Sequence, residues 1–184
     1  MSPVPPFRHF LQPGEYMFSR RSLRIGTLLG SCIAFTCWHP QLRIGGMCHY
    51  LLPARNGSRF GGGLDGRYAD EALALLLHKM RQAKTDPAEY EIKMFGGGNM
   101  FPNQPGRSML NVGERNIRAG RILLLQHGLP CKAFDVGGAG HRRVELDLAS
   151  GDVWVRRVGM DDGDAQTLPC QQCKAGELCH LACC

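Results

Sequence analysis

Apolar residues gather in short runs along the first third of the chain, and these runs predict two adjacent strands. Residues 33–38 are rich in β-branched and aromatic side chains, a composition that favours a strand. A second run of this kind covers residues 44–52. The segment between them contains Pro40, whose ring presets a turn backbone. We therefore predict an antiparallel hairpin with Pro40 and Gln41 at the centre of its turn.

Two longer segments show the three-to-four-residue spacing of apolar side chains that indicates amphipathic helices. The first covers residues 68–83, with acidic residues in its first turn and basic residues in its last, as the helix dipole favours. The second covers residues 112–126, where Asn111 is the expected N-cap and Glu114 stands at the third helical position. The apolar stripe of the first helix comprises Leu73, Leu76, Leu77 and Met80.

Other apolar runs predict further strands at residues 91–95 and 131–136, and a hairpin of residues 144–148 with 153–157. Two main helices and about six strands, mostly in hairpins, indicate an α+β fold with helices on a mixed sheet. Apolar periodicity ends near residue 160. We therefore expect one domain over residues 1–160, followed at 161–184 by a linker and a flexible cysteine-rich tail.

The predicted hairpin brings a cysteine and a histidine together. With its turn centred on Pro40 and Gln41, Cys32 lies directly opposite His49. Opposed residues of an antiparallel pair have Cβ atoms about 4.5–5.5 Å apart, which allows a thiol–imidazole contact. A slip of one residue in the register would send the two side chains to opposite faces. The sequence thus predicts a Cys–His pair that depends on the register.

Composition narrows the classes of function. The net charge of +6 comes from scattered basic residues with no Lys/Arg run, so we expect a diffuse surface charge and no nucleic-acid partner. The chain has no run of eighteen apolar residues, and we expect no membrane insertion. The proline-rich N-terminus lacks the apolar core of a secretory signal. A cytoplasmic protein with reduced cysteines is predicted.

The nine cysteines form two groups. Four are spread through the body of the chain, and five crowd the last fifteen residues. In the tail, a Cys-x-x-Cys pair and a nearby Cys-His pair have the ligand types of a tetrahedral zinc site, although their spacing is unusually short. A zinc site and a reduced, flexible tail both stay open as interpretations. The ligands of such a site would be Cys170, Cys173, Cys179 and His180.

Several motifs in one order resemble the CheD family of chemoreceptor glutamine deamidases. The first pair is Leu29-Gly30-Ser31-Cys32 and Gly45-Gly46-Met47-Cys48-His49. The others are the glycine turn at residues 95–101, the helix start Val112-Gly113-Glu114-Arg115-Asn116, and Asp135-Val136-Gly137-Gly138 followed by Arg142 and the hairpin at Gly151. The resemblance covers residues 14–158.

This resemblance implies an α/β/α-type sandwich and a protein-glutamine glutaminase that acts on methyl-accepting chemotaxis receptors in adaptation. It implies a CheC-type phosphatase as a partner and no cofactor. It maps the nucleophile onto Cys32 and the base onto His49. Thr27, five residues before Cys32, is the nearest candidate for the threonine of the family's triad.

The residues suggest a mechanism. A primary amide needs a thiolate nucleophile, and ion pairing with an imidazolium lowers a thiol pKa. We expect the Cys32 thiolate to attack the glutamine carbonyl carbon and the His49 imidazolium to protonate the departing ammonia. Backbone N–H groups of Gly30 and Ser31 are candidates for the oxyanion site. Two alternatives are a non-catalytic adaptor that regulates a CheC-type phosphatase and a sensor based on the cysteine tail.

Overall fold

The computed structural model describes residues 8–55, 63–101, 111–158 and 168–169. Two five-stranded sheets and two helices make up this part of the chain. Sheet A has the strand order β1-β3-β8-β9-β10, and sheet B has the order β2-β5-β4-β6-β7. Sheet A contains β1 (Arg8–Phe10), β3 (Arg24–Leu29), β8 (His141–Asp147), β9 (Val153–Val158) and β10 (Leu168–Pro169). Sheet B contains β2 (Tyr16–Ser19), β5 (Ile44–Tyr50), β4 (Ile33–His39), β6 (Glu91–Gly96) and β7 (Cys131–Val136).

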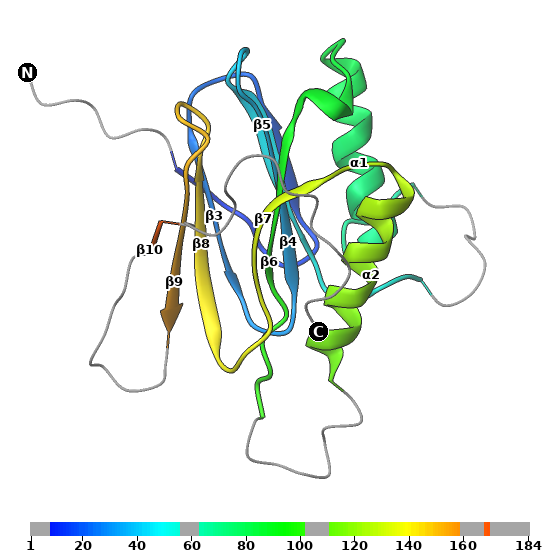
Figure 1. Cartoon of the computed structure of the whole chain (residues 1–184), viewed down its shortest axis with the longest axis vertical. Helices are drawn as coiled ribbons and strands as arrows, with labels where there is room; N and C mark the ends of the chain where they lie inside the picture. Colours follow the sequence, from blue (N-terminus) through cyan, green and yellow to red (C-terminus); the bar gives the residue numbers. More distant parts are fainter. Residues whose placement is uncertain (1–7, 56–62, 102–110, 159–167, 170–184) are drawn as a thin grey trace, which may run out of the picture.

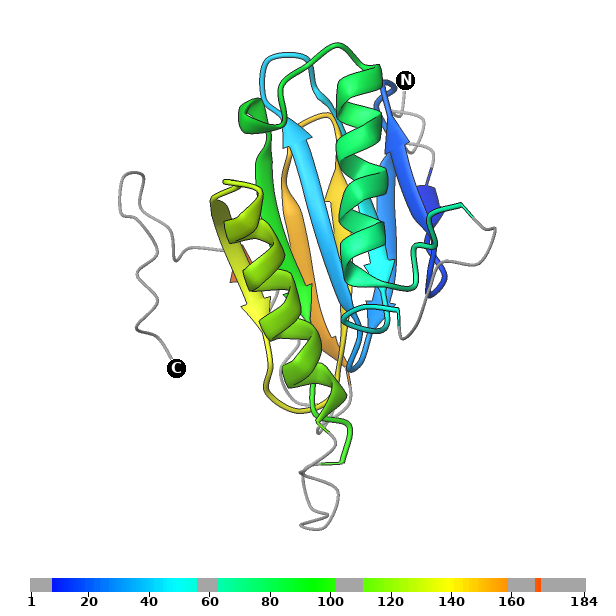
Figure 2. The same ribbon diagram turned by 90° about the vertical axis from the view of Figure 1, so that its right-hand side faces the viewer.

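The layers follow the order sheet A, sheet B, helices (Figure 1). Helices α1 (Ala69–Gln82) and α2 (Val112–Gln126) lie side by side over the outer face of sheet B (Figure 2). A short 3-10 helix, η1 (Pro87–Glu89), precedes β6. Sheet B is therefore covered on both faces, and β5 is buried along its whole length. Sheet A covers the face that the helices leave open.

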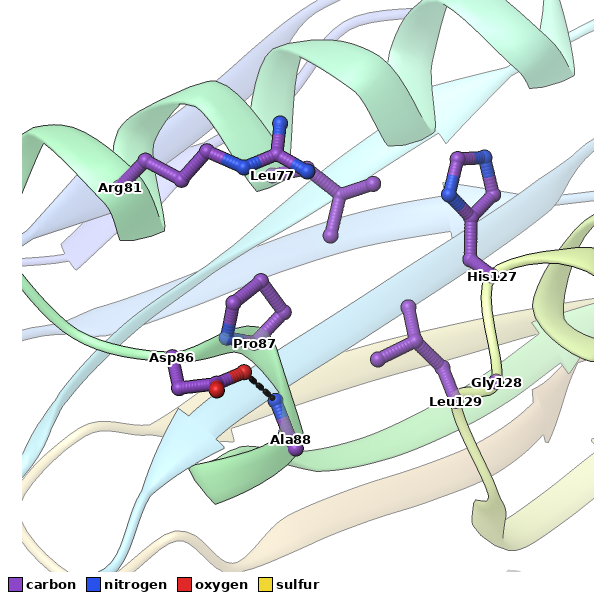
Figure 3. Close-up of a pocket in the computed structure, with 8 residues that line it drawn as sticks. All are labelled: Leu77, Arg81, Asp86, Pro87, Ala88, His127, Gly128 and Leu129. Carbon is purple, nitrogen blue, oxygen red and sulfur yellow. Dashed lines mark hydrogen bonds between the residues drawn. The ribbon is translucent and has the colours of Figure 1, made fainter.

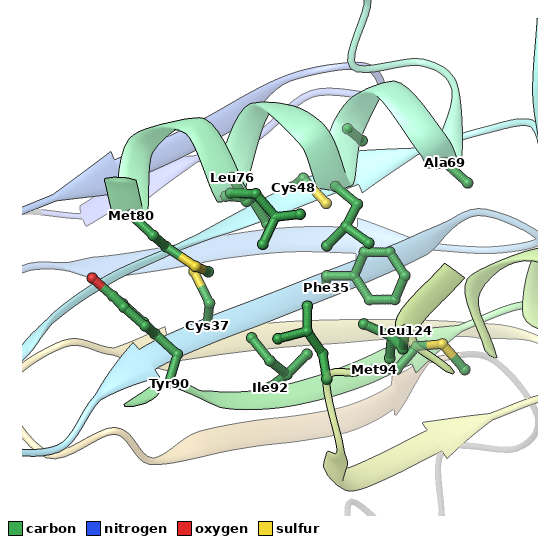
Figure 4. Close-up of a cluster of buried hydrophobic side chains, with 14 of the residues drawn as sticks. Phe35, Cys37, Cys48, Ala69, Leu76, Met80, Tyr90, Ile92, Met94 and Leu124 are labelled. Atoms are coloured by element: carbon green, nitrogen blue, oxygen red, sulfur yellow. The ribbon is translucent and has the colours of Figure 1, made fainter. Parts of the chain in front are cut away.

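Successive side chains of β4 point to opposite faces of sheet B, so they pack into two different hydrophobic cores. Phe35 and Cys37 face the helices, where they pack with residues of α1 and α2 (Figure 4). Ala34 faces sheet A and packs with residues such as Ile25 and Leu146. The core between the two sheets is the one that concerns function, because it also contains buried polar side chains. Buried among them are Thr27 and His49.

The structure confirms the α+β class and both predicted helices, including the cap of α2, where the Asn111 side chain accepts from the Glu114 N–H at 3.3 Å. The layer order differs from an α/β/α sandwich, because both helices lie on one face of sheet B and a second sheet lies on the other. The period-two pattern of β8 and β9 explains this, since it gives sheet A one apolar face that must be covered. Strands β1, β2 and β3 lie outside the strands that the sequence predicts. Strand β10 comes from the segment expected to be a linker.

The predicted hairpin register is wrong by two residues. His49 lies opposite Ala34, not Cys32, because the turn has four residues, Pro40 to Arg43. Arg43 adopts a left-handed φ of 52°, and its N–H donates to the carbonyl of His39 at 2.8 Å, which closes the longer turn. A shift of two residues preserves the face on which each side chain lies. Cys32, one residue before β4, therefore stays on the same side as His49, the side toward sheet A.

Candidate active site

Cys32 lies in the loop that carries the chain from sheet A to sheet B. This loop, residues 30–32, connects the end of β3 to the start of β4. The Cys32 side chain is half-buried and packs against the core between the sheets, and it is a free thiol. A thiol at the rim of the inter-sheet space is accessible to a substrate while one side of it stays in contact with the interior. We call residues 30–32 the nucleophile loop.

Every carbonyl of the nucleophile loop accepts a hydrogen bond from a neighbouring element. The Gly98 N–H donates to the Gly30 oxygen at 2.8 Å, and the Gly97 N–H donates to the Cys32 oxygen at 2.8 Å. The Asn116 side chain donates to the Ser31 oxygen at 3.0 Å. Three consecutive anchors fix the backbone on which the thiol stands.

Glycine is required where the turn after β6 meets this loop. Gly96 has a φ of 115°, and a Cβ placed there would lie 2.1 Å from the Cys32 carbonyl oxygen. Only a residue without a side chain permits this close backbone approach at a positive φ. The glycine turn that the sequence showed after β6 therefore supports the nucleophile loop, as a turn and not as a phosphate-binding loop.

His49 is held by a threonine on the other sheet. The His49 Nδ1 lies 2.7 Å from the Thr27 Oγ1, and the Thr27 hydroxyl donates to the Leu11 carbonyl at 2.9 Å. A hydroxyl has one proton, and here it is given to Leu11. The Nδ1 of His49 must therefore carry the proton and donate to Thr27. This leaves a lone pair on Nε2, which is buried and has no hydrogen-bond partner among the described residues.

Burial sets the charge of both groups. It raises the pKa of the Cys32 thiol, and it lowers the pKa of His49 to about 4, with the charge of Glu15 acting in the opposite direction. Near neutral pH the resting pair is consequently a neutral thiol and a neutral imidazole. This differs from the resting ion pair expected from the sequence. The thiolate has to form by proton transfer to Nε2, whose lone pair is free for it.

The two residues expected to supply the oxyanion site, Gly30 and Ser31, belong to the nucleophile loop. Gly30 is tightly enclosed: a Cβ there would lie 2.8 Å from the Met100 sulfur and 3.4 Å from the His141 Cδ2. His141, at the start of β8, thus borders the loop from sheet A. A residue with a side chain at position 30 would displace these neighbours.

A buried arginine supports the neighbouring loop. Arg142 has no exposed surface, and its guanidinium donates to the carbonyl and carboxylate of Asp135 and to the carbonyl of Gly137. The Gly137 N–H in turn donates to the Gly96 carbonyl at 2.9 Å. The loop between β7 and β8 is thereby joined to the glycine turn behind Cys32.

Sequence reasoning missed two partners that the fold brings in. Leu11 supplies the carbonyl that orients Thr27, and nothing in the residue type signals this. Asn116 was noted only as part of a helix-start motif, and its side chain contacts the nucleophile loop. The available signal was an uncharged polar residue in the first half of a predicted helix, and this signal does not identify the contact.

Two surface pockets are lined by described residues other than Cys32, His49 and Thr27. One of about 450 Å³ lies between α1, η1 and the loop after α2, with Arg81 and His127 on opposite sides of it (Figure 3). A second, of about 380 Å³, borders the glycine turn at Gly97 and the start of α2. Neither pocket is lined by Cys32, His49 or Thr27.

In the described part of the chain, no group of three or more His, Cys, Asp or Glu side chains is arranged to hold a metal ion. The tail residues considered as zinc ligands, Cys170, Cys173, Cys179 and His180, lie outside the described residues. No helix within the described ranges is long and apolar enough to cross a membrane.

A half-buried thiol and an imidazole oriented by a third group are the features of a cysteine-dependent hydrolase. Comparison with known proteins gives the family. The model of the family described as CheD chemotactic sensory transduction matches residues 51–157, beginning just after His49. The chain belongs to the CheD family.

The curated relatives agree with this family. The chain is 45% identical over 162 residues to a probable chemoreceptor glutamine deamidase CheD 2 from Albidiferax ferrireducens, covering 86% of this chain and 94% of the relative. It is 47% identical over 155 residues to a probable chemoreceptor glutamine deamidase CheD from Pseudomonas syringae pv. tomato, covering 84% and 91%. A relative of the same description from Leptospira interrogans is 36% identical over 154 residues, covering 80% and 91%.

Proposed function

We propose that this chain is a protein-glutamine deamidase that converts glutamine side chains of chemotaxis receptors to glutamate, with release of ammonia, and that Cys32, His49 and Thr27 carry the reaction. The activity follows from membership of the CheD family and from the names of its relatives. We assign it to residues 1–160 and place it in the cytoplasm, without a cofactor. The roles of the three residues are argued from their geometry.

The first half of the reaction forms a thioester. As the Cys32 sulfur attacks the glutamine Cδ, the thiol proton passes to His49 Nε2, whose lone pair is free. The carbonyl oxygen gains negative charge, and N–H groups of Gly30 and Ser31 are proposed to stabilise it. The imidazolium then gives its proton to the amide nitrogen. The C–N bond breaks, ammonia leaves, and the acyl group stays on Cys32.

The second half returns the enzyme to its resting state. Neutral His49 takes a proton from a water molecule as the water oxygen attacks the thioester carbon. The C–S bond breaks, the glutamate product leaves, and the proton on Nε2 returns to the Cys32 sulfur. Through both halves Thr27 accepts from Nδ1–H and keeps Nε2 as the nitrogen that exchanges protons.

The single observation that carries this proposal is the hydrogen-bond chain from His49 to Thr27 to the Leu11 carbonyl. It joins two sheets, fixes the tautomer of a buried histidine and leaves its other nitrogen unpaired. The test is incubation of a recombinant receptor fragment with the protein, followed by intact mass and ammonia measurement. Wild type should change the mass from amide to acid and release ammonia in equal amounts, and Cys32→Ala should do neither.

We further propose that the domain binds a CheC-type phosphatase, as its family implies. The adaptor hypothesis makes this binding the sole function. The enzyme and the adaptor hypotheses predict different results. A Cys32→Ala protein that keeps phosphatase binding but loses deamidation supports an enzyme with a regulatory partner. A wild-type protein that binds the phosphatase and deamidates no receptor supports the adaptor.

A further inference from the structure

Asn116 joins the strand of the base to the loop of the nucleophile. Its side chain, fully buried in the first half of α2, donates from Nδ2 to the Ser31 carbonyl at 3.0 Å and to the Leu51 carbonyl at 2.7 Å. Ser31 precedes Cys32, and Leu51 is the first residue after β5, two residues beyond His49. Both acceptors are carbonyls, so only the NH₂ end of the amide can face them. Both of its protons are used.

The position of this amide relative to the β4–β5 ladder explains its importance. The last paired residues of the ladder are Ile33 and Tyr50. Beyond them the strands diverge, because the N–H groups of Leu51 and Leu52 donate to the Arg67 carbonyl instead. Cys32 stands at the first position past the ladder. The Asn116 side chain bridges the two chains where backbone pairing has ended.

Helix α2 is itself fixed at this point. The start of the helix packs directly on the glycine turn, where a Cβ on Gly113 would lie 2.4 Å from the Gly97 oxygen. The amide is therefore presented from a rigid element. It cannot follow the nucleophile loop if that loop moves.

We propose that Asn116 is a positioning residue for deamidation, holding the Cys32 sulfur at the right place relative to His49 Nε2. This inference rests on the proposed function of the pair. It assigns no contact between Asn116 and the substrate. A displacement on the order of 1 Å at reacting groups costs roughly a hundredfold in rate, so loss of both hydrogen bonds should act on the chemical step.

The experiment compares Asn116→Ala and Asn116→Leu with a matched control, Tyr50→Phe. Asparagine to leucine keeps the volume and removes both donors, and it also removes Oδ1, which is buried with no partner among the described residues. Tyr50→Phe removes a hydrogen bond to the backbone of the same residue and leaves the amide bridge intact. All proteins are checked for folding by thermal unfolding before kinetics, and either Asn116 variant that folds is sufficient.

Two readouts are taken. In deamidation of a receptor fragment, we expect kcat to fall roughly tenfold to a hundredfold in the Asn116 variants with KM within about twofold, and Tyr50→Phe to stay near wild type. In alkylation of Cys32 by iodoacetamide, we expect the variants to react faster than wild type at neutral pH, because a released loop exposes the thiol. Folded Asn116 variants with wild-type kcat and wild-type alkylation overturn the inference, as does an equal loss in Tyr50→Phe. If wild type deamidates nothing, the proposed function fails while the alkylation arm still tests the bridge.

Discussion

Replacing Thr27 with valine removes the hydroxyl that joins His49 to Leu11 and keeps the shape of the side chain. Two buried groups then lose their partner, the His49 Nδ1–H and the Leu11 carbonyl. An unsatisfied buried polar group costs about 1–3 kcal/mol, so with two such groups we expect the free energy of unfolding to fall by about 2–6 kcal/mol. Thr27→Ser keeps the hydroxyl and should retain most of that stability.

The kinetic effect follows from the loss of orientation. General base catalysis contributes roughly a hundredfold to ten-thousandfold, and the valine variant keeps the imidazole packed between the sheets while losing its preferred tautomer. We expect kcat to fall roughly tenfold to a hundredfold in Thr27→Val, and by much less in Thr27→Ser. Initial rates come from intact mass of a receptor fragment, and urea unfolding gives the stability. Nitrogen NMR of labelled histidine reports the tautomer directly.

The reasoning is refuted if Thr27→Val turns over at the wild-type rate, or if NMR places the proton of resting His49 on Nε2. Equal losses in the serine and valine variants would also contradict it, because then the hydroxyl would not be the group that matters.

Three other changes test separate parts of the structure. Cys32 should react slowly with iodoacetamide at neutral pH, and the rate should rise only at pH values above the ordinary pKa of a thiol, because burial raises the pKa of Cys32. A fast rate that does not change from weakly acidic to neutral pH would indicate a resting ion pair instead. Gly96→Ala should lower kcat and stability more than Gly128→Ala, measured side by side: both have positive φ, but only the first would place a Cβ against the Cys32 oxygen. Arg142→Leu should lower the free energy of unfolding in urea by about 3–5 kcal/mol, because it leaves a partly buried partner charge. Arg143→Leu, at a partly exposed ion pair, should lower it by under about 1 kcal/mol. Similar losses in the two variants would show that burial of Arg142 is immaterial.

Stability should also depend on pH through His49. Burial lowers its pKa from 6.5 to about 4, so the unfolded chain binds more protons between these values. The contribution of neutral His49 to the free energy of unfolding is therefore fully present above pH 6.5 and is lost as the pH falls toward 4. The loss is about 3 kcal/mol if this group acts alone. Urea unfolding from pH 7 to pH 4 measures the slope, and His49→Gln should reduce it. An unchanged slope in the variant would assign the dependence to other groups.

Local patterns in the sequence were sufficient for both helices. The stripe of α1 and the N-cap of α2 are set by residues near one another in the chain, so their positions could be predicted within one or two residues. The hairpin register could not, because it depends on the left-handed conformation of Arg43, which is not a residue type that signals it. The strands β4 and β5 are buried on both faces, so alternation gives no check on their register.

The candidate site shows the same division. The pairing of Cys32 with His49 stays a prediction despite the wrong register, because an error of two residues conserves the side of the strand on which each side chain lies. The contact between Thr27 and His49 depends on two sheets packing face to face, which no local pattern specifies. The same holds for Asn116, 85 residues from Ser31 along the chain and in hydrogen-bond contact with it.

The central claim is that the Cys32 sulfur becomes bonded to the substrate. Rapid acid quench of the wild-type protein during turnover of a short glutamine-containing receptor peptide, followed by digestion and mass spectrometry, tests this most directly. The account predicts a peptide containing Cys32 that carries the substrate acyl group during turnover, and far less of this peptide in His49→Gln, because attack by the neutral thiol needs Nε2 to take its proton. Turnover with no acylated Cys32 at any time, or deamidation by Cys32→Ala at the wild-type rate, would contradict it.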